Sequence, residues 1–358
     1  MDIFAYLEGM AAQHGPSGHE GQVSAWMAER FKPLCDSVTI DPLYNVIALK
    51  KATIPTPDGS PAPKVMLSAH QDEIALMVAD ILPDGTLRMG QVGGVDPRIL
   101  PAAVVTVHAT GSGKPRALTG VVGAVPPHLL TQAEQKKNYT RENLFVDLGL
   151  KADKVKRLVN VGDLITLRGP ATKLLNGRAA SKTMDDRACV GALLCAAERL
   201  QTMNYLCDVY FVASSQEEVG AQGAYVAAYT IDPDLAVVLD VTHATIPASR
   251  TDTTVPLDAP AVTYGPFIQH KLLERLKKTA KDNGVKINAE HSTRSTGTDT
   301  DVIQVARAGV PCVLIDLPLK YMHTTVELLD MNAIAECGRL LAHFLADIKA
   351  DWRDGLWN

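Results

Sequence analysis

The chain of 358 residues has no cysteines at C-x-x-C spacing, and its cysteines are few and scattered. They are Cys35, Cys189, Cys195, Cys207, Cys312 and Cys337. Such a pattern fits buried thiols in a reducing compartment better than a disulfide framework or a cysteine-type zinc site. The sequence therefore gives no reason to expect a fold built on disulfides.

Segments for targeting, membrane insertion and nucleic-acid binding are also missing. No apolar stretch approaches the roughly 20 residues that span a bilayer. The N-terminal residues Met1–Glu8 lack the basic and apolar regions of a secretory signal. A formal charge of −5 without a basic run argues against nucleic acid as the main partner. We expect a soluble, cytoplasmic protein that binds neither nucleic acid nor a membrane.

The composition and length fit a globular protein of two domains. Hydrophobic residues make up 46% and charged residues 21% of the chain, so a large core is possible and disorder is not indicated. At roughly 100–200 residues per domain, the length suggests two domains. We find no repeats or low-complexity tracts.

Hydrophobic periodicity divides the chain into α/β parts around an all-β part. Helices are expected at 2–13, 22–31, 186–200, 220–229, 268–283, 301–308 and 331–348, with strands at 37–40, 45–49, 64–69, 209–213, 235–240, 285–287 and 312–315. Between them, short strands at 75–79, 103–108, 119–122 and 164–167 are separated by Gly, Pro and Asp turns, with one short helix at 151–157. This order predicts an α/β fold with a mostly parallel sheet flanked by helices, into which a small all-β domain is inserted. We expect a discontinuous α/β domain, 1–73 and 165–358, and an inserted domain, 74–164.

Two adjacent carboxylates, Glu217 and Glu218, follow the buried strand Val209–Ala213. Burial of neighbouring anions is unfavourable unless cations or protons compensate them. With a bound metal cluster, one Glu could be a ligand while the other accepts a proton from the attacking water. The plainer alternative is a solvated pair in a loop.

Other acidic and histidine residues fall at or beyond the ends of predicted strands, where open α/β sheets bind ligands. His70 ends its strand, and Asp72 is spaced to orient that imidazole, although a structural histidine would look the same. Asp185 and Asp186 enter a helix, where N-capping is the simpler role. Asp240 ends a strand and could be a turn residue. His323 alone could be any surface histidine. Together, two histidines, three carboxylates and a spare glutamate match the donors of a two-metal hydrolytic site.

Six motifs, in this order and spacing, resemble the glutamyl aminopeptidase or tetrahedral aminopeptidase family of dinuclear metallopeptidases, and the match covers nearly the whole chain. They are His70–Ile74, Met184–Ala188, Glu217–Gly220, Leu239–Ala244, Ser295–Asp299 and Tyr321–Glu327. The resemblance implies an aminopeptidase with two divalent metal ions per subunit, zinc or cobalt, which removes N-terminal residues from short peptides.

The resemblance also implies a role for each matched residue. Asp185 would bridge both metals; His70 and Asp240 would complete one site, and Glu218 and His323 the other. Glu217 would be the general base, and Asp72 would orient His70. The inserted domain, which contains none of these ligands, would make subunit contacts and build a homododecamer from dimers, with the active sites facing inward.

Departures from the usual motifs bear on substrate preference. Ala75 stands where Gly is usual, Ala221-Gln222 replaces Leu-Arg, and Lys320 replaces Arg. None removes a ligand. Arg250, Arg294 and Lys320 are the basic candidates for an acidic-substrate pocket, and a solvated surface is the alternative for the first two.

Two other functions stay open. They are metal-dependent deacylation of N-acyl amino acids and endoglucanase-type glycoside hydrolysis, because relatives of the family have carried an endoglucanase label; the two histidines would have no role in the second. A metal-storing scaffold would leave Glu217 unexplained.

Overall fold

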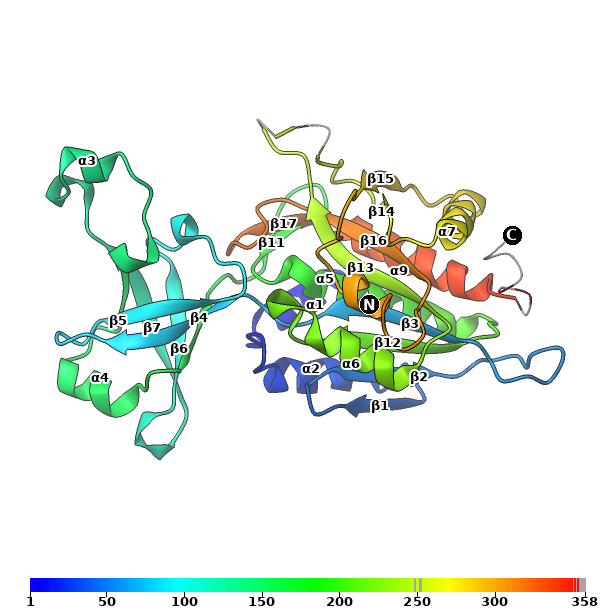
Figure 1. The fold of residues 1–358 in the computed structure, drawn as a ribbon, viewed down its shortest axis with the longest axis horizontal. Helices are drawn as coiled ribbons and strands as arrows, with labels where there is room; N and C mark the ends of the chain where they lie inside the picture. Colours follow the sequence, from blue (N-terminus) through cyan, green and yellow to red (C-terminus); the bar gives the residue numbers. More distant parts are fainter. Residues whose placement is uncertain (248, 251–252, 350, 352, 354–358) are drawn as a thin grey trace.

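A computed structural model describes residues 1–247, 249–250, 253–349, 351 and 353 of the chain. Figure 1 shows two bodies side by side, a barrel and an α/β body. Each has its own cluster of buried hydrophobic residues. Within the described residues, no helix combines the length and the apolarity that crossing a bilayer requires.

The α/β body is built on a sheet whose strand order is β1-β2-β12-β3-β13-β16-β14-β15. The strands are β1 (Ser37–Ile40), β2 (Val46–Lys50), β3 (Lys64–His70), β12 (Asp208–Ser214), β13 (Leu235–His243), β14 (Ala261–Tyr264), β15 (Asn288–His291) and β16 (Cys312–Leu319). The four central strands, β12, β3, β13 and β16, are parallel to one another. They are buried on both faces, which explains their nearly continuous apolar sequences.

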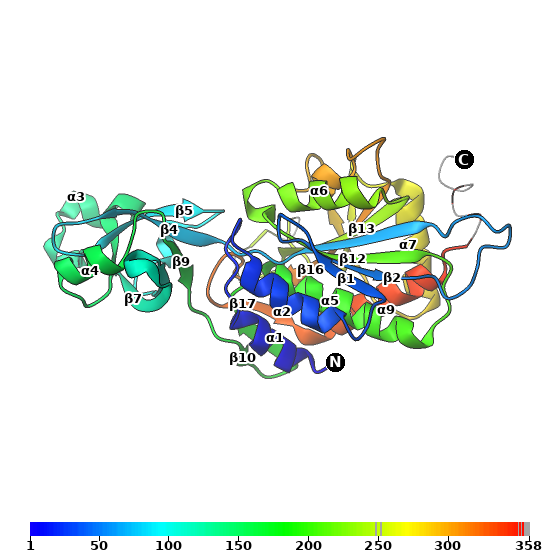
Figure 2. The same ribbon diagram turned by 90° about the horizontal axis from the view of Figure 1, so that it is seen from below.

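Helices cover both faces of this sheet, as Figure 2 shows. The first face carries α1 (Ile3–Ala11), α2 (Gly21–Phe31), α5 (Met184–Arg199) and α9 (Met331–Ala346), and the other carries α6 (Gln222–Ile231) and α8 (Thr300–Ile303). The helix α7 (His270–Asp282) packs against α9. A small sheet of β10 (Thr172–Lys173), β11 (Arg178–Ser181) and β17 (Glu327–Asp330) belongs to the same body and packs against α5 and α9. These layers confirm the predicted mostly parallel α/β fold.

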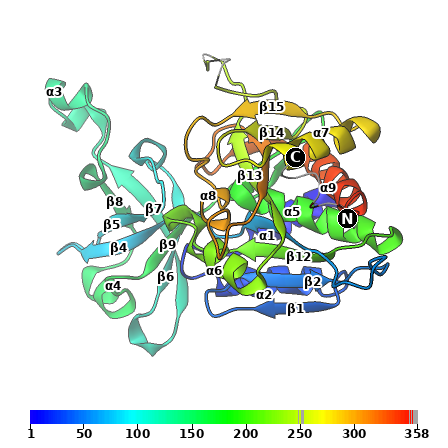
Figure 3. The same cartoon turned by 45° about the vertical axis from the view of Figure 1, so that its right-hand side comes forward.

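The barrel closes in the order β4-β5-β8-β7-β6-β9 and leaves the body through two connections (Figure 3). Its strands are β4 (Ala75–Ile81), β5 (Leu87–Val92), β6 (Val104–Ala109), β7 (Arg116–Ala124), β8 (Leu144–Asp147) and β9 (Leu164–Leu167). Two short helices, α3 (Gln132–Gln135) and α4 (Ala152–Leu158), accompany them. The barrel is the inserted all-β unit that the sequence predicts, and we propose that it extends through Leu167, because β9 closes it.

Several predicted elements differ from the structure. The strand expected at 285–287 is wrong: the Val285 N–H bonds to the Ala280 carbonyl at 2.8 Å as α7 ends, and β15 begins only at Asn288. The helix expected at 301–308 ends at Ile303. The helix expected from Gly220 begins at Gln222, because Gly220 has a φ of 123° that no α-helix contains.

Candidate metal centre

The residues singled out by their strand-end positions lie at one edge of the central sheet. His70 is the last residue of β3 and is paired with Ser214, the last residue of β12. Glu217 and Glu218 follow β12 in a short 3-10 helix, η6 (Glu217–Val219). Because neighbouring parallel strands end at the same edge, the fold brings these side chains together from distant parts of the sequence.

Asp185 lies between the two histidines. Its Oδ1 is 3.0 Å from His70 Nε2, and its Oδ2 is 3.2 Å from His323 Nε2. The His323 Nε2 atom is also 3.4 Å from Glu218 Oε1. Each oxygen of one carboxylate therefore faces a different imidazole.

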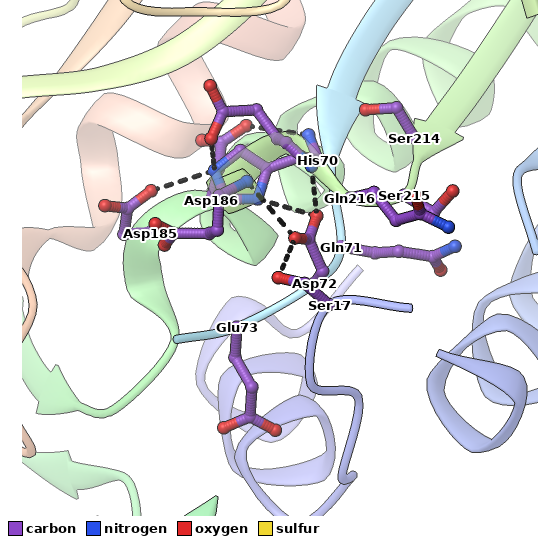
Figure 4. Close-up of polar contacts among 12 residues, drawn as sticks. Ser17, His70, Gln71, Asp72, Glu73, Asp185, Asp186, Ser214, Ser215 and Gln216 are labelled. Carbon is purple, nitrogen blue, oxygen red and sulfur yellow. Dashed lines mark hydrogen bonds and ion pairs between the residues drawn. The ribbon is translucent and has the colours of Figure 1, made fainter. Parts of the chain in front are cut away.

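The two aspartates at the start of α5 do not serve as ordinary helix caps. Asp185 and Asp186 have non-helical backbone angles, and the peptide bond that joins them is cis. Asp186 Oδ2 accepts a hydrogen bond from the His70 backbone N–H at 3.1 Å, while Asp185 faces the His70 ring (Figure 4). Both carboxylates thus face His70, which disfavours the N-capping alternative.

Two groups of candidate ligands share Asp185. Donor atoms of His70, Asp185 and Asp240 all lie within 4.8 Å of one another, and so do donor atoms of Asp185, Glu218 and His323. Imidazole nitrogen and carboxylate oxygen are the donors that zinc and related divalent cations prefer. The donor set fits a metal ion in each group. Glu217 belongs to neither group.

The electrostatics of the cluster also favour a cation. Burial raises the pKa of Glu217 to about 9 and that of Glu218 to about 8, and it raises the pKa of Asp240. Burial lowers the pKa of His323, but its bond to Asp185 and the charge of Glu218 outweigh burial and raise that pKa to about 9. Buried carboxylates in excess of the imidazoles need protons or cations among them.

Asp72 connects His70 to the carboxylate pair. This fully buried side chain has Oδ1 at 3.4 Å from His70 Nδ1 and accepts a hydrogen bond from Ser17 Oγ at 2.6 Å (Figure 4). It also accepts from the backbone N–H groups of Glu217 and Glu218, at 3.1 and 3.3 Å. Burial opposes its ionisation, but the contact with His70 holds the pKa of Asp72 below its usual value. Asp72 is placed to fix the orientation of His70 and the backbone of η6 together.

Two partners of His323 were not found from the sequence. Its Nδ1 lies 2.9 Å from the Gly94 carbonyl, in the barrel, and an Nδ1–H donated there leaves Nε2 facing Asp185 and Glu218. Buried Glu327 accepts from the backbone N–H groups of His323, at 2.8 Å, and Asp185, at 3.2 Å. A backbone carbonyl has no sequence signature, whereas Glu327 stood within the last matched motif without a role.

Left-handed backbone conformations mark the same segments. Thr183, Gln216 and His323 have φ values of 59°, 57° and 60°, although none of them is glycine. Thr183 lies two residues before Asp185, and Gln216 lies immediately before Glu217. His323 is itself a candidate ligand. Such conformations cost of order 1–3 kcal/mol each and gather where side chains must be aimed.

The centre opens into a cavity of ≈ 500 Å³. Its described lining includes Asp185, Glu217, Glu218, Asp240 and His323. Of the basic residues proposed for an acidic-substrate pocket, Arg250, Arg294 and Lys320, none belongs to that lining.

Comparisons with known proteins agree with this arrangement. The M42 glutamyl aminopeptidase family matches residues 52–340. The lysyl aminopeptidase of Pyrococcus furiosus is 35% identical over 340 residues, which cover 94% of each chain. The structure of the TET aminopeptidase from Thaumarchaeota archaeon SCGC AB-539-E09 superposes with a TM-score of 0.91 at 28% identity and covers 99% of this chain and 98% of that one. The dodecamer PhTET1-12s gives a TM-score of 0.82 at 25% identity and covers 97% of this chain and 100% of that one. The chain therefore belongs to the M42 glutamyl aminopeptidase family of peptide hydrolases.

Proposed function

We propose that this aminopeptidase uses two divalent cations, zinc or cobalt, in one shared site. His70 and Asp240 would hold one cation, Glu218 and His323 the other, and Asp185 both. The observation that carries the proposal is the position of Asp185, whose two oxygens face the two histidines at 3.0 and 3.2 Å.

When bound, such cations supply Lewis acidity that makes water a stronger nucleophile at neutral pH and polarises the scissile carbonyl. The remaining tasks fall to the protein. Glu217, outside both ligand groups and 3.8 Å from His70 Nε2, accepts the proton of the attacking water and passes it to the departing amine. Asp72 holds the His70 ring in place.

The Glu217→Gln variant tests this division of roles. We expect kcat on aminoacyl p-nitroanilides to fall by about 10²–10⁴-fold, the usual contribution of a general base. Metal content, measured by mass spectrometry of the purified protein, should stay at the wild-type value. Turnover close to wild type would reject Glu217 as the base.

A matched control is Glu274→Gln. Glu274 lies on α7, pairs with Lys277 at 2.9 Å and is outside the cavity lining, so the same loss of charge there should leave kcat unchanged. A fall in kcat for both variants would point to a general loss of charge or stability instead.

Assays of the same purified protein distinguish two other hydrolytic functions. A deacylase would hydrolyse N-acyl amino acids faster than free aminoacyl amides after metal removal and add-back. An endoglucanase would keep its activity on a cellulose derivative in the presence of a chelator, since two carboxylates suffice for that chemistry. The convergence of both histidines on Asp185 favours the aminopeptidase over the endoglucanase.

We further propose that the chain assembles into a homododecamer from dimers, through contacts of the barrel. The dodecameric structure of PhTET1-12s supports this assembly, in which short peptides would reach inward-facing sites. Light scattering should give a mass twelve times the 38.4 kDa of the chain. A monomeric mass would contradict the proposal.

The relatives do not define the preferred N-terminal residue. The family description says glutamyl, whereas the relative from Pyrococcus furiosus is named a lysyl aminopeptidase. The side chains of the cavity must decide between them.

A further inference from the structure

One more acidic residue, Glu290, lines the cavity that contains the candidate metal centre. It lies on β15, near the edge of the sheet, and belongs to neither group of candidate ligands. No matched motif includes Glu290, so it was not predicted as a site residue. Its carboxylate has no role in the chemistry proposed for the centre.

The strand β13 connects Glu290 to the centre. Asp240 and Thr242 are two residues apart on this strand, so they share one face of the sheet, about 7 Å apart. Thr242 Oγ1 donates a hydrogen bond to Glu290 Oε1 at 2.7 Å. This hydrogen bond places the Glu290 carboxylate next to Thr242, farther along β13 than Asp240 and in the same cavity lining.

Among the described residues, no lysine or arginine forms an ion pair with Glu290. Glu290 Oε2 is buried and has no hydrogen-bond partner. Behind it, buried Asp316 accepts from Thr263 Oγ1 at 2.5 Å, and Thr263 is the register partner of Glu290. Burial raises the pKa of Glu290 and that of Asp316, and the charge of Glu290 raises the second further.

The groups that could offset this charge are imidazoles. His243 and His291 face Glu290 closely enough to lower its pKa, but less than burial raises it. Among the residues that the structure describes, the cavity lining contains no lysine or arginine. Either a proton or a cation brought by the substrate could satisfy the Glu290 carboxylate.

We propose that Glu290 makes the enzyme selective for peptides with an N-terminal lysine or arginine. The ammonium or guanidinium group binds the Glu290 carboxylate, and the aliphatic part of the side chain lies along Val241 and Met322, which line the same cavity. An N-terminal glutamate places a like charge against Glu290 and is disfavoured. The inference rests on the aminopeptidase function proposed above.

The test compares kcat/KM of wild type and Glu290→Gln on lysyl, arginyl, leucyl and glutamyl p-nitroanilides. Wild type should prefer lysyl and arginyl to leucyl substrates, with glutamyl substrates the poorest. In the variant, kcat/KM for lysyl and arginyl substrates should fall about tenfold or more, as expected for a lost charge-assisted hydrogen bond, while leucyl hydrolysis changes less than about threefold. The conservative variant Glu290→Asp keeps the charge and should retain more of the lysyl-to-leucyl ratio than Glu290→Gln.

The matched control is Asp258→Asn, which removes one negative charge near the same sheet edge. Asp258 pairs with Lys286 at 2.6 Å and is not part of the lining, so its loss should leave the lysyl-to-leucyl ratio unchanged. An equal fall for lysyl and leucyl substrates in Glu290→Gln would overturn the inference, and so would a wild type that prefers glutamyl or leucyl substrates. Absence of hydrolysis of all four substrates by the metal-loaded wild type would instead reject the proposed function.

Discussion

The barrel and the α/β body contribute to the candidate metal centre in different ways. The body supplies every side chain in the two groups of candidate ligands, together with Glu217. The barrel supplies backbone: its Gly94 carbonyl lies 2.9 Å from His323 Nδ1. A β-carbon at Gly94 would lie 3.0 Å from His323 Cε1, so the absence of a side chain permits this close approach. Substitutions of the body's site residues should therefore remove a ligand or the proposed base. Substitutions at Gly94 in the barrel should change the orientation of His323.

The largest effect is expected in the body, from Asp185→Asn. This change removes the one carboxylate common to both ligand groups, so both cations should be lost or disordered. We expect a metal content well below wild type by mass spectrometry, with activity reduced at least as far as in Glu217→Gln. Two ions retained per subunit would contradict the bridging role.

A smaller effect is expected from Asp72→Asn, because Asp72 contacts a candidate ligand but is not one itself. The variant loses the charge that faces His70 Nδ1 and should weaken metal binding or activity by about 10–100-fold. Activity titrated against added zinc or cobalt measures the loss. Saturating metal should restore much of the activity, unlike in Glu217→Gln, and a variant with unchanged metal affinity would reject the orienting role.

In the barrel, Gly94→Val should weaken the centre without removing any donor. The new side chain would push the carbonyl away from His323, so we expect metal affinity to fall by about tenfold, the lower range for an outer partner of a ligand. Gly90→Val is the control, because Gly90 also lies in the barrel, on β5, its φ is not positive, and a β-carbon there meets no atom within 4 Å. Equal metal affinity of Gly94→Val and wild type would show that the barrel does not aim His323.

The smallest effect is expected at the contact between the two bodies, as a dependence of stability on pH. His14 of the body and His108 of the barrel both lie 3.0 Å from Thr166 Oγ1. Burial lowers the pKa of His14 to about 4, helped by the charge of Lys182, and burial lowers the pKa of His108. The unfolded chain therefore binds protons more readily than the native state below about pH 6.5, and the free energy of unfolding should fall as pH decreases from 6.5 to 4.

Thermal melts at pH 7.5 and 5 measure this effect. His14→Gln should reduce the loss of stability on acidification by on the order of 1 kcal/mol, a value discounted because His14 is partly exposed. The double variant with His108→Gln should reduce it further. An unchanged difference between the two pH values in both variants would contradict the assignment.

Several site residues could be predicted from the sequence because they are acidic or histidine residues that follow the ends of buried strands. His70, Glu217 and Asp240 were predicted because buried apolar strands lead directly to them. Gly94 was missed, because a backbone carbonyl is present at every residue. Glu290 was missed because Asn288–His291 is a short, partly exposed strand with weak alternation, and its neighbour β14 was not predicted at all. The positions of Gly94 and Glu290 in the site depend on contacts between segments that are far apart in the sequence, which a local sequence pattern does not contain.

The connection between β3 and β4 has a mechanical consequence. Only residues 71–74 separate His70, the end of a core strand, from Ala75, the first residue of the barrel. Asp72 lies within this link, and so does Glu73, which is held by Lys182 at 2.5 Å and Arg187 at 3.2 Å. The link to the barrel thus contains Asp72, whose carboxylate contacts the candidate ligand His70. If the barrel makes the proposed subunit contacts, a shift of the barrel on assembly would act on this link, and the proposed metal centre would respond to it.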